Sequence, residues 1–174
     1  MKKWSLIILG VLVGLVAFMY VVGAMLPREH VATRSAHFNQ PPDKIWQAIT
    51  DYKSFTTWRA GLKSVEPLPN KHGWPQWKET LSDGMVMPLE TTEYIPLMRM
   101  VTRITDPALP FGGTWTYALT SDGSGCTLRI WENGYVNPPL FRFLSRFVFG
   151  HTSTMDDYLR SLGKKFNESV TPQP

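Results

Sequence analysis

The hydrophobic pattern begins with an unbroken apolar run from Leu6 to Leu26, which follows Lys2 and Lys3. The run contains no charged residue, and its length of about 21 residues is enough to cross a hydrocarbon core of about 30 Å as a helix. We therefore expect residues 1–28 to form a single-pass membrane anchor. Its representative apolar positions are Leu6, Leu12, Val16, Tyr20 and Leu26.

The same run has a second interpretation, as a cleavable signal peptide with small residues at Val22-Gly23-Ala24. The apolar stretch before that point is about 17 residues, longer than the usual 7–15, which favours the anchor. Positive charge is slightly greater before the run than after it. This bias predicts a cytoplasmic N-terminus and a soluble domain on the non-cytoplasmic side.

After the anchor, the apolar positions first alternate with a period of two and then recur at helical spacing. Residues 30–38 are expected to form a strand, and residues 42–50 a short helix. Pro42 suits the first turn of that helix, where a missing N–H group has no consequence. A second short helical segment is expected over residues 51–58.

Between residues 65 and 136 the pattern is that of strands separated by turn residues. Residues 121–125, Ser-Asp-Gly-Ser-Gly, are typical of a hairpin turn between the last two strands. The expected strands cover residues 65–68, 74–81, 85–95, 98–105, 114–120 and 127–136.

The last element is predicted to be one long helix from Pro139 to Lys165, with Gly150 as a point where it could kink or break. Its first part, residues 141–149, is aromatic on nearly every side and has two interpretations. It either begins a core helix, the interpretation we favour, or dips into a membrane interface. The expected inward stripe is Phe141, Leu144, Val148, Met155, Leu159, Leu162 and Phe166.

This order of elements predicts an α+β fold, in which a curved antiparallel sheet wraps around a long C-terminal helix and leaves a space to be filled. Three segments carry a family resemblance: residues 39–52 followed by Trp58, the Trp115-x-Tyr117-x-Leu119 strand, and residues 134–138. They resemble the START-like superfamily, the helix-grip fold shared by polyketide cyclase/dehydrase and lipid-transport proteins. The resemblance implies a ligand-binding domain over residues 29–167, followed by a flexible tail, 168–174.

Composition narrows the classes of function. The net charge of +4 includes two lysines ahead of the apolar run, so the soluble part lacks the concentrated basic face of a nucleic-acid-binding protein. The single cysteine, Cys126, excludes an intramolecular disulfide and a cysteine-based zinc cluster. The histidine spacing indicates no metal site, and no nucleotide-binding or nucleophile motif is present. We expect neither a metal nor another cofactor.

The candidate ligand site is a set of aromatic, aliphatic and acidic positions on the expected strands and last helix. Glu132 is the most informative, because period two carries it to the same face as two apolar neighbours, and a buried carboxylate needs a partner. Arg99 and Arg103 are candidate partners, and His151 follows Gly150 near the inward stripe. The expected cavity residues are Trp77, Trp115, Tyr117, Leu128, Ile130, Glu132 and Met155.

We therefore expect membrane-anchored binding, carriage or sensing of a lipid-like or aromatic hydrophobic small molecule. We expect a binding protein rather than an enzyme. One alternative is a cyclase or dehydratase in which Glu132 and His151 act as acid and base. The other is a structural or assembly factor whose interior is filled by its own side chains.

Overall fold

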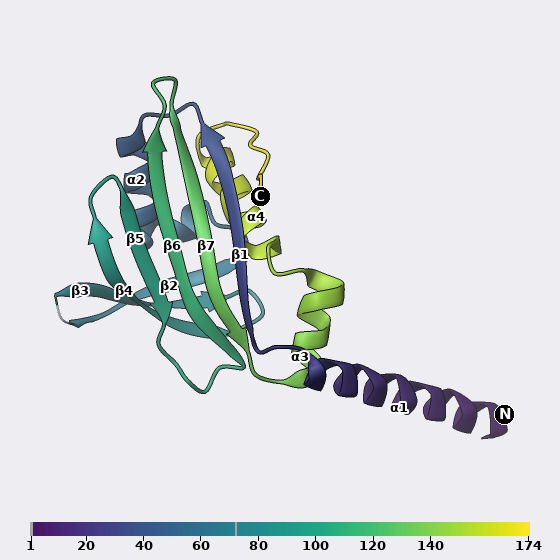
Figure 1. Ribbon diagram of the computed structural model, residues 1–174. Coiled ribbons are helices and arrows are strands. Elements are labelled where there is room, and N and C mark those ends of the chain that lie inside the picture. The colour runs from purple at the N-terminus through teal and green to yellow at the C-terminus, as the bar shows by residue number, and fades with distance from the viewer. Residues whose placement is uncertain (1, 72) are drawn as a thin grey trace.

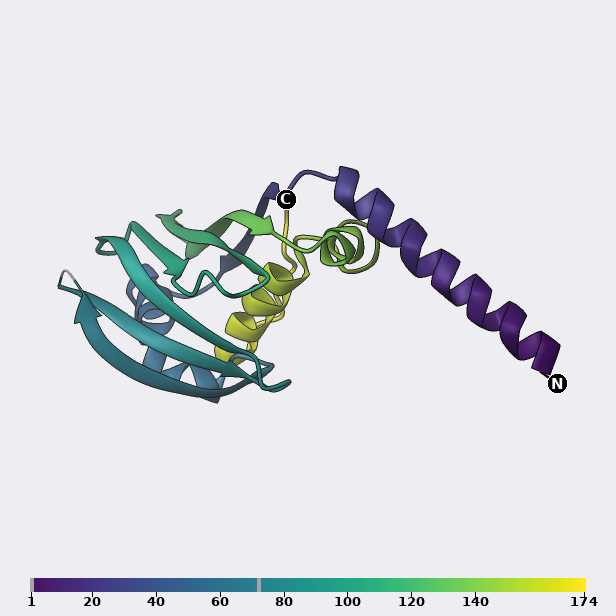
Figure 2. The same cartoon turned by 90° about the horizontal axis from the view of Figure 1, so that it is seen from below.

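The computed structural model describes residues 2–71 and 73–174, and it begins with a 24-residue helix, α1 (Lys2–Met25). This helix projects from the rest of the molecule without packing along it (Figures 1 and 2). Within the described residues, the segment Trp4–Met25 is the one stretch long and apolar enough to cross a membrane, and almost none of it is buried in the protein. A signal sequence would meet the same criterion.

The remaining chain is built on one antiparallel sheet of seven strands in the order β1-β7-β6-β5-β4-β3-β2. The N-terminal strand therefore pairs with the C-terminal one, and the sheet curls around the helices (Figure 2). The strands are β1 (Glu29–Phe38), β2 (Leu62–Lys71), β3 (Trp74–Leu81), β4 (Val86–Ile95), β5 (Arg99–Ile104), β6 (Phe111–Ser121) and β7 (Cys126–Val136).

Two helices cover the concave face of the sheet. Helix α2 (Pro42–Thr50) buries Ile45 and Ile49, and a 3-10 segment, η1 (Tyr52–Thr57), follows it. Helix α4 (Ser153–Lys165) buries one apolar side, including Met155 and Leu159, against the same core. The predicted α+β helix-grip fold is confirmed.

The expected long C-terminal helix is divided, and the division falls at Gly150, the residue named above as a possible break. The segment divides into α3 (Pro139–Leu144), a π-helical turn η2 (Ser145–Phe149) and α4, and the chain changes direction at Gly150, whose φ is 75°. Glycine adopts this left-handed conformation without the steric penalty of a side chain. Because the break separates the two halves, Phe141 is 48 % and Val148 61 % exposed, so these positions do not continue the core stripe of α4.

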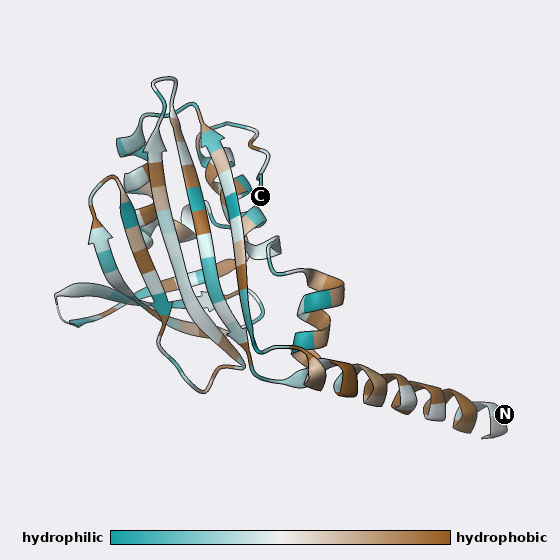
Figure 3. Cartoon of the chain, viewed as in Figure 1, coloured by the Kyte–Doolittle hydropathy of each residue, from teal (hydrophilic) through white to brown (hydrophobic). Residues whose placement is uncertain are grey.

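Helix α3, the first part of this segment, lies instead against the C-terminal end of α1 (Figure 3). Gly23 allows this approach, since a Cβ atom there would lie 1.9 Å from the carbonyl oxygen of Pro139. Arg142 Nη1 donates a hydrogen bond of 2.7 Å to the carbonyl oxygen of Leu26, which follows the last turn of α1. The interpretation of residues 141–149 as the start of a core helix is therefore wrong.

The C-terminal residues, expected to form a flexible tail, are placed beside β1. The backbones of Ser35 and Gln173 exchange two hydrogen bonds, of 2.9 and 2.8 Å. Glu168 accepts hydrogen bonds from the Asn39 backbone and the Gln40 side chain at the turn before α2. These contacts extend the edge of the sheet next to β1.

Candidate functional site

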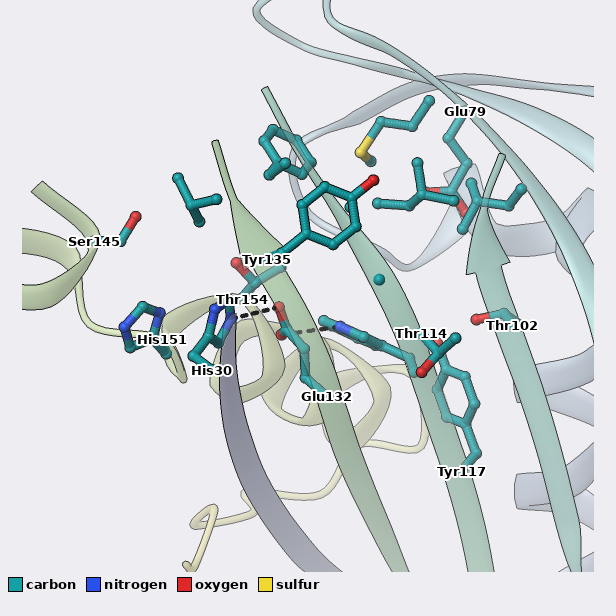
Figure 4. A pocket seen from close by; sticks show the side chains of 18 of the residues that line it. His30, Glu79, Thr102, Thr114, Tyr117, Glu132, Tyr135, Ser145, His151 and Thr154 are labelled. Carbon is teal, nitrogen blue, oxygen red and sulfur yellow. Dashed lines mark hydrogen bonds and ion pairs between the residues drawn. The ribbon is translucent and has the colours of Figure 1, made fainter. Parts of the chain in front are cut away.

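A cavity of about 280 Å3 lies inside the fold, between the concave face of the sheet and the helices (Figure 4). Its walls come from β1 and β3 to β7, from α2 and η1, and from the segment that leads from α3 into α4. Most of the lining is apolar or aromatic, with polar groups gathered at two places. The lining side chains include Ile49, Phe55, Arg59, Trp77, Glu79, Met87, Leu89, Thr102, Trp115, Tyr117, Glu132, Tyr135, His30 and His151.

The first polar group is centred on Glu132, whose two carboxylate oxygens have different partners. Oε1 lies 3.1 Å from His30 Nε2, and Oε2 accepts a 3.0 Å hydrogen bond from the indole Nε1 of Trp115. Figure 4 shows Glu132 and His30 facing each other at the cavity wall. Strand register explains the arrangement, because Trp115 is the direct cross-strand partner of Glu132, and His30 lies on β1 opposite Gly134.

Gly134 makes room for this pair of side chains. A Cβ atom at residue 134 would lie 2.6 Å from His30 Nε2 and 2.8 Å from Glu132 Oε1, closer than real Cβ atoms approach other groups. The glycine inside β7 thus leaves the space that the side chains of His30 and Glu132 occupy.

Gly134→Ala is expected to force His30 and Glu132 apart and to lower the free energy of unfolding by about 1–3 kcal/mol through overpacking. Asn133→Ala, an exposed neighbour on the same strand, is expected to change it by less than about 0.5 kcal/mol. Denaturant unfolding of the detergent-solubilised full chain, followed by tryptophan fluorescence, measures both. Equal stability of the two variants would show that the pair does not need the glycine.

His151 extends this group, because its ring stacks on that of His30 with centroids 4.0 Å apart and an interplanar angle of 22°. Burial, reinforced by His30 and by the positive charge of Arg146, lowers the pKa of His151 below its usual value of 6.5. The imidazole is therefore neutral at physiological pH and can accept or donate a single hydrogen bond at each nitrogen.

This lowered pKa predicts a dependence of stability on pH. As the pH falls below about 6.5, the unfolded chain protonates residue 151 more readily than the folded chain, so folding loses stability. Replacing His151 with glutamine is expected to reduce the loss of stability between about pH 7 and pH 5. Unfolding midpoints measured across that range for both proteins test this, and parallel curves would contradict it.

The second polar group lies on the far side of the lining and is centred on Glu79 (Figure 4). Its Oε1 atom accepts hydrogen bonds of 2.6 Å from Arg59 Nη1 and 3.0 Å from Trp77 Nε1. The Arg59 guanidinium also lies 5.0 Å from the ring centre of Phe55 and 5.2 Å from that of Tyr158. Burial lowers the pKa of Arg59, but Glu79 opposes this and leaves the pKa raised.

Two tyrosines stand next to this ion pair. Burial raises the pKa of Tyr117 and of Tyr158 above the usual value of 10, so both hydroxyl groups remain protonated at physiological pH. Tyr117 lines the cavity, and Tyr158 of α4 packs edge-on against Trp115 and contacts the ring of Tyr117. The wall between the two polar groups is therefore largely aromatic.

The structure brings some of the predicted site residues together and places others elsewhere. Trp77, Trp115, Tyr117, Glu132 and His151 all line the cavity. The remaining three residues are fully buried in the hydrophobic core and do not line the cavity. These residues are Leu128, Ile130 and Met155.

The predicted partners of Glu132 are not its partners. Arg103 forms an ion pair with Glu90, and Arg99 forms one with Glu93, both away from Glu132. Hydrogen bonds from Arg103 and Gln76 keep the pKa of Glu90 below its usual value, although burial acts to raise it. Strand pairing explains the error, because the register sets Arg103 opposite Glu90 across β4 and β5.

Sequence reasoning missed His30, Arg59 and Glu79. The signal for Glu79 was present, since period two places it on the same face of β3 as Trp77. The signal for His30 was indirect, because a glycine inside a strand, such as Gly134, often marks the close approach of another group. Arg59 follows a 3-10 segment and carries no periodic signal.

The buried Cys126 does not line the cavity. Burial, with a smaller effect of Asp122, raises the pKa of the Cys126 thiol to about 11, and its sulfur contacts the carbonyl oxygen of Gln40 at 3.4 Å. Among the described residues, no group of three His, Cys, Asp or Glu side chains is arranged to hold a metal ion.

A curved sheet gripping a C-terminal helix around an internal cavity defines a helix-grip, START-like domain. The chain belongs to the polyketide cyclase/dehydrase and lipid transport family, whose model matches residues 29–166. A comparison with curated proteins gives no match by sequence.

Solved structures agree with this fold. The di-domain ARO/CYC StfQ from the steffimycin biosynthetic pathway is 13 % identical with a TM-score of 0.63; the alignment covers 78 % of this chain but only half of that one. A Thermobifida fusca protein is 16 % identical with a TM-score of 0.61, and the alignment covers 78 % of this chain and 92 % of that one. The Mesorhizobium loti protein MLL2253 is 19 % identical with a TM-score of 0.58, and the alignment covers 80 % of this chain and 97 % of that one. At these identities the likeness concerns the fold.

Proposed function

We propose that this protein binds a lipid-like or aromatic hydrophobic small molecule in its internal cavity, and that α1 holds the domain at a membrane. Carriage or sensing of that molecule is the role that the site supports best. The observation that carries the proposal is the cavity itself, with apolar and aromatic walls and two separate polar groups.

The size and chemistry of the cavity favour a small, mainly apolar ligand. Its volume of about 280 Å3 is close to the lower end of the range for ligand sites, about 300–1,000 Å3. A ligand that buries about 300 Å2 of apolar surface gains about 7 kcal/mol before the entropy of association is subtracted. Such a gain is compatible with useful affinity for a membrane-derived molecule.

The polar groups offer positions for the ligand's polar end. His30 Nδ1 is buried and has no hydrogen-bond partner among the described residues. If Nε2 donates to Glu132, Nδ1 of the neutral ring is an acceptor, and a ligand hydroxyl group could satisfy it. The ligand would then place its hydroxyl end near His30 and its apolar part toward Met87 and Leu89.

The proposed position of α1 would increase the concentration of ligand near the cavity. Apolar molecules partition into bilayers, so a tethered domain samples a local concentration well above that in water. The α3–η2 segment, which contributes Phe141 and Ser145 to the cavity wall, contacts the end of α1. A ligand leaving the membrane would therefore have a short path to the cavity.

The Glu132–His30 contact supports a second candidate function, that of an enzyme. A carboxylate paired with an imidazole can move a proton, as a cyclase or dehydratase requires, and His151 stacks on that imidazole. The alternative differs from the sequence-based hypothesis because His30, rather than His151, contacts Glu132. A turnover assay in which Glu132→Gln abolishes product formation but preserves ligand affinity would favour it.

The structural-factor alternative required an interior without free volume, and the cavity argues against it.

Photo-crosslinking tests the proposed binding site. The full chain in mild detergent is irradiated with a long-chain alcohol that carries a diazirine in its alkyl chain, and the labelled peptides are mapped by mass spectrometry. We expect labels in β3, β4 and β6, saturable by excess unlabelled alcohol. Labels confined to α1 and η2 would indicate contact with the detergent-embedded surface alone and would overturn the proposal.

A further inference from the structure

A second cavity, of about 330 Å3, lies between the end of α1, the start of β1 and the α3–η2 segment. Three guanidinium groups line it, those of Arg28, Arg142 and Arg146, together with the imidazoles of His30 and His151. Glu29 is its single acidic lining residue. The cavity is therefore strongly basic in a protein whose net charge is small.

Arg142 is the central group of this cavity. Its residue is only 9 % exposed, and its Nη1 atom bonds the Leu26 carbonyl, yet its Nε atom is buried without a hydrogen-bond partner in the described part of the chain. None of the ion pairs among the described residues joins Arg28, Arg142 or Arg146 to a carboxylate. A buried guanidinium without an anion is unfavourable, so a negatively charged ligand in this cavity would stabilise Arg142.

We propose that this cavity binds the phosphate group of an anionic phospholipid. Arginine matches phosphate because its planar guanidinium can offer two parallel N–H donors to two oxygens. Arg142 would contact the phosphate from the inside of the cavity, and Arg28 and Arg146, both exposed, from its rim. The proposal rests on the proposed function in one respect, namely that α1 lies in a membrane.

The position of the cavity favours a lipid over a soluble phosphate. It adjoins the end of the apolar helix, the depth at which headgroup phosphates lie if α1 crosses a bilayer. On the same α3–η2 segment, Phe147, Val148 and Phe149 of η2 are exposed apolar side chains that follow Arg146 of the cavity lining. Arginines next to exposed aromatic side chains are typical of segments that lie in the interface of anionic membranes.

The two cavities share His30, Val136 and His151 in their linings. A lipid held by its phosphate at Arg142 would therefore stand next to the wall of the ligand cavity. The second site would orient the domain on the membrane, with the α3–η2 segment turned toward the headgroups. It need not be occupied by the molecule that the main cavity binds.

Thermal unfolding of the full chain in mild detergent, at constant ionic strength, tests this site with three probes. These are the short-chain lipid dihexanoyl phosphatidylglycerol, its phosphatidylcholine counterpart and inorganic phosphate. We expect the anionic lipid to raise the unfolding midpoint saturably and the other two probes to have much weaker effects. An equal effect of inorganic phosphate would overturn the assignment to a lipid, and no effect of any probe would overturn the site.

Variants locate the binding. Arg146→Gln changes an exposed side chain that makes no hydrogen bond or ion pair with the described residues, so we expect the fold to be preserved. We expect it to weaken phosphatidylglycerol binding by about tenfold or more. Arg142→Gln is expected to have a larger effect but also loosens the contact with α1. Arg99→Gln, on a distant exposed ion pair, is the matched control and is expected to bind as the unaltered protein does. Unchanged binding by Arg146→Gln would contradict the proposal.

A third comparison separates this site from the main cavity. Met87→Trp, which fills the main cavity, is expected to retain the response to phosphatidylglycerol. If it loses that response, the lipid occupies the main cavity and the second site is overturned. If photo-crosslinking of the main cavity fails while the response persists, the proposed function fails alone.

Discussion

Replacement of Arg59 with methionine is expected to lower the free energy of unfolding by about 3–5 kcal/mol. Glu79 is only 2 % exposed, and Arg59 is its one charged partner at hydrogen-bond distance among the described residues. The variant leaves a buried carboxylate with the Trp77 indole as its remaining donor. It also removes the guanidinium that packs between the rings of Phe55 and Tyr158.

Two comparisons distinguish a lost ion pair from a general packing defect. The double variant Arg59→Met with Glu79→Met removes both charges and is expected to recover most of the lost stability. Arg99→Met breaks the exposed pair with Glu93 and is expected to cost less than about 1 kcal/mol. Denaturant unfolding of each protein measures these values. A double variant as unstable as Arg59→Met would show that shape, not charge, governs this end of the cavity.

Met87→Trp is expected to weaken binding of a hydrophobic ligand by about tenfold or more, equivalent to about 1.4 kcal/mol. Met87 lies opposite Glu79 in the pairing of β3 with β4, and its side chain lines the cavity. An indole at this position would occupy the space that the ligand needs. Titration with a fluorescent hydrophobic probe gives the dissociation constants.

Val86→Trp is the matched control, because the neighbouring side chain points away from the cavity and is 42 % exposed. It adds the same indole to the same strand and is expected to bind the probe as the unaltered protein does. Equal losses of affinity in both variants would attribute the effect to distortion of β4. Unchanged affinity in Met87→Trp would place the probe outside the cavity.

Local patterns predicted most of the elements because each one buries a single face. Helix α2 was predicted with its observed bounds, and β3 likewise, since apolar period and turn residues agree in both segments. Strand β2 was predicted too short. Its exposed and half-buried residues give a weak alternation, and pairing with β3 extends it to residues 62–71.

The last helix shows where pattern reasoning failed. Apolar residues on both sides of Gly150 were counted as one stripe, although a change of chain direction at a glycine rotates the two faces independently. Residues 141–149 remained apolar for a different reason than core packing. Helix α3 lies against the end of α1, and η2 exposes its apolar side chains, a tertiary relationship that spacing along the chain does not reveal.

Strand alternation predicted which side chains of the candidate site face inward, but it could not predict their partners from distant parts of the sequence. Alternation indicated that Glu132 and Trp115 face inward. The partners His30 and Arg59 are brought in by pairing of β1 with β7 and by the chain after η1, from distant parts of the sequence. Their contacts with acidic residues depend on register and on local room, such as that left by Gly134.

Native mass spectrometry of the full chain released from mild detergent tests the central claim most directly, because it detects any bound molecule without assuming its identity. The account predicts a hydrophobic small molecule that remains bound to the unaltered protein and to Val86→Trp and is absent from Met87→Trp. Failure to detect any bound molecule from several lipid extracts, or equal retention by all three proteins, would contradict it.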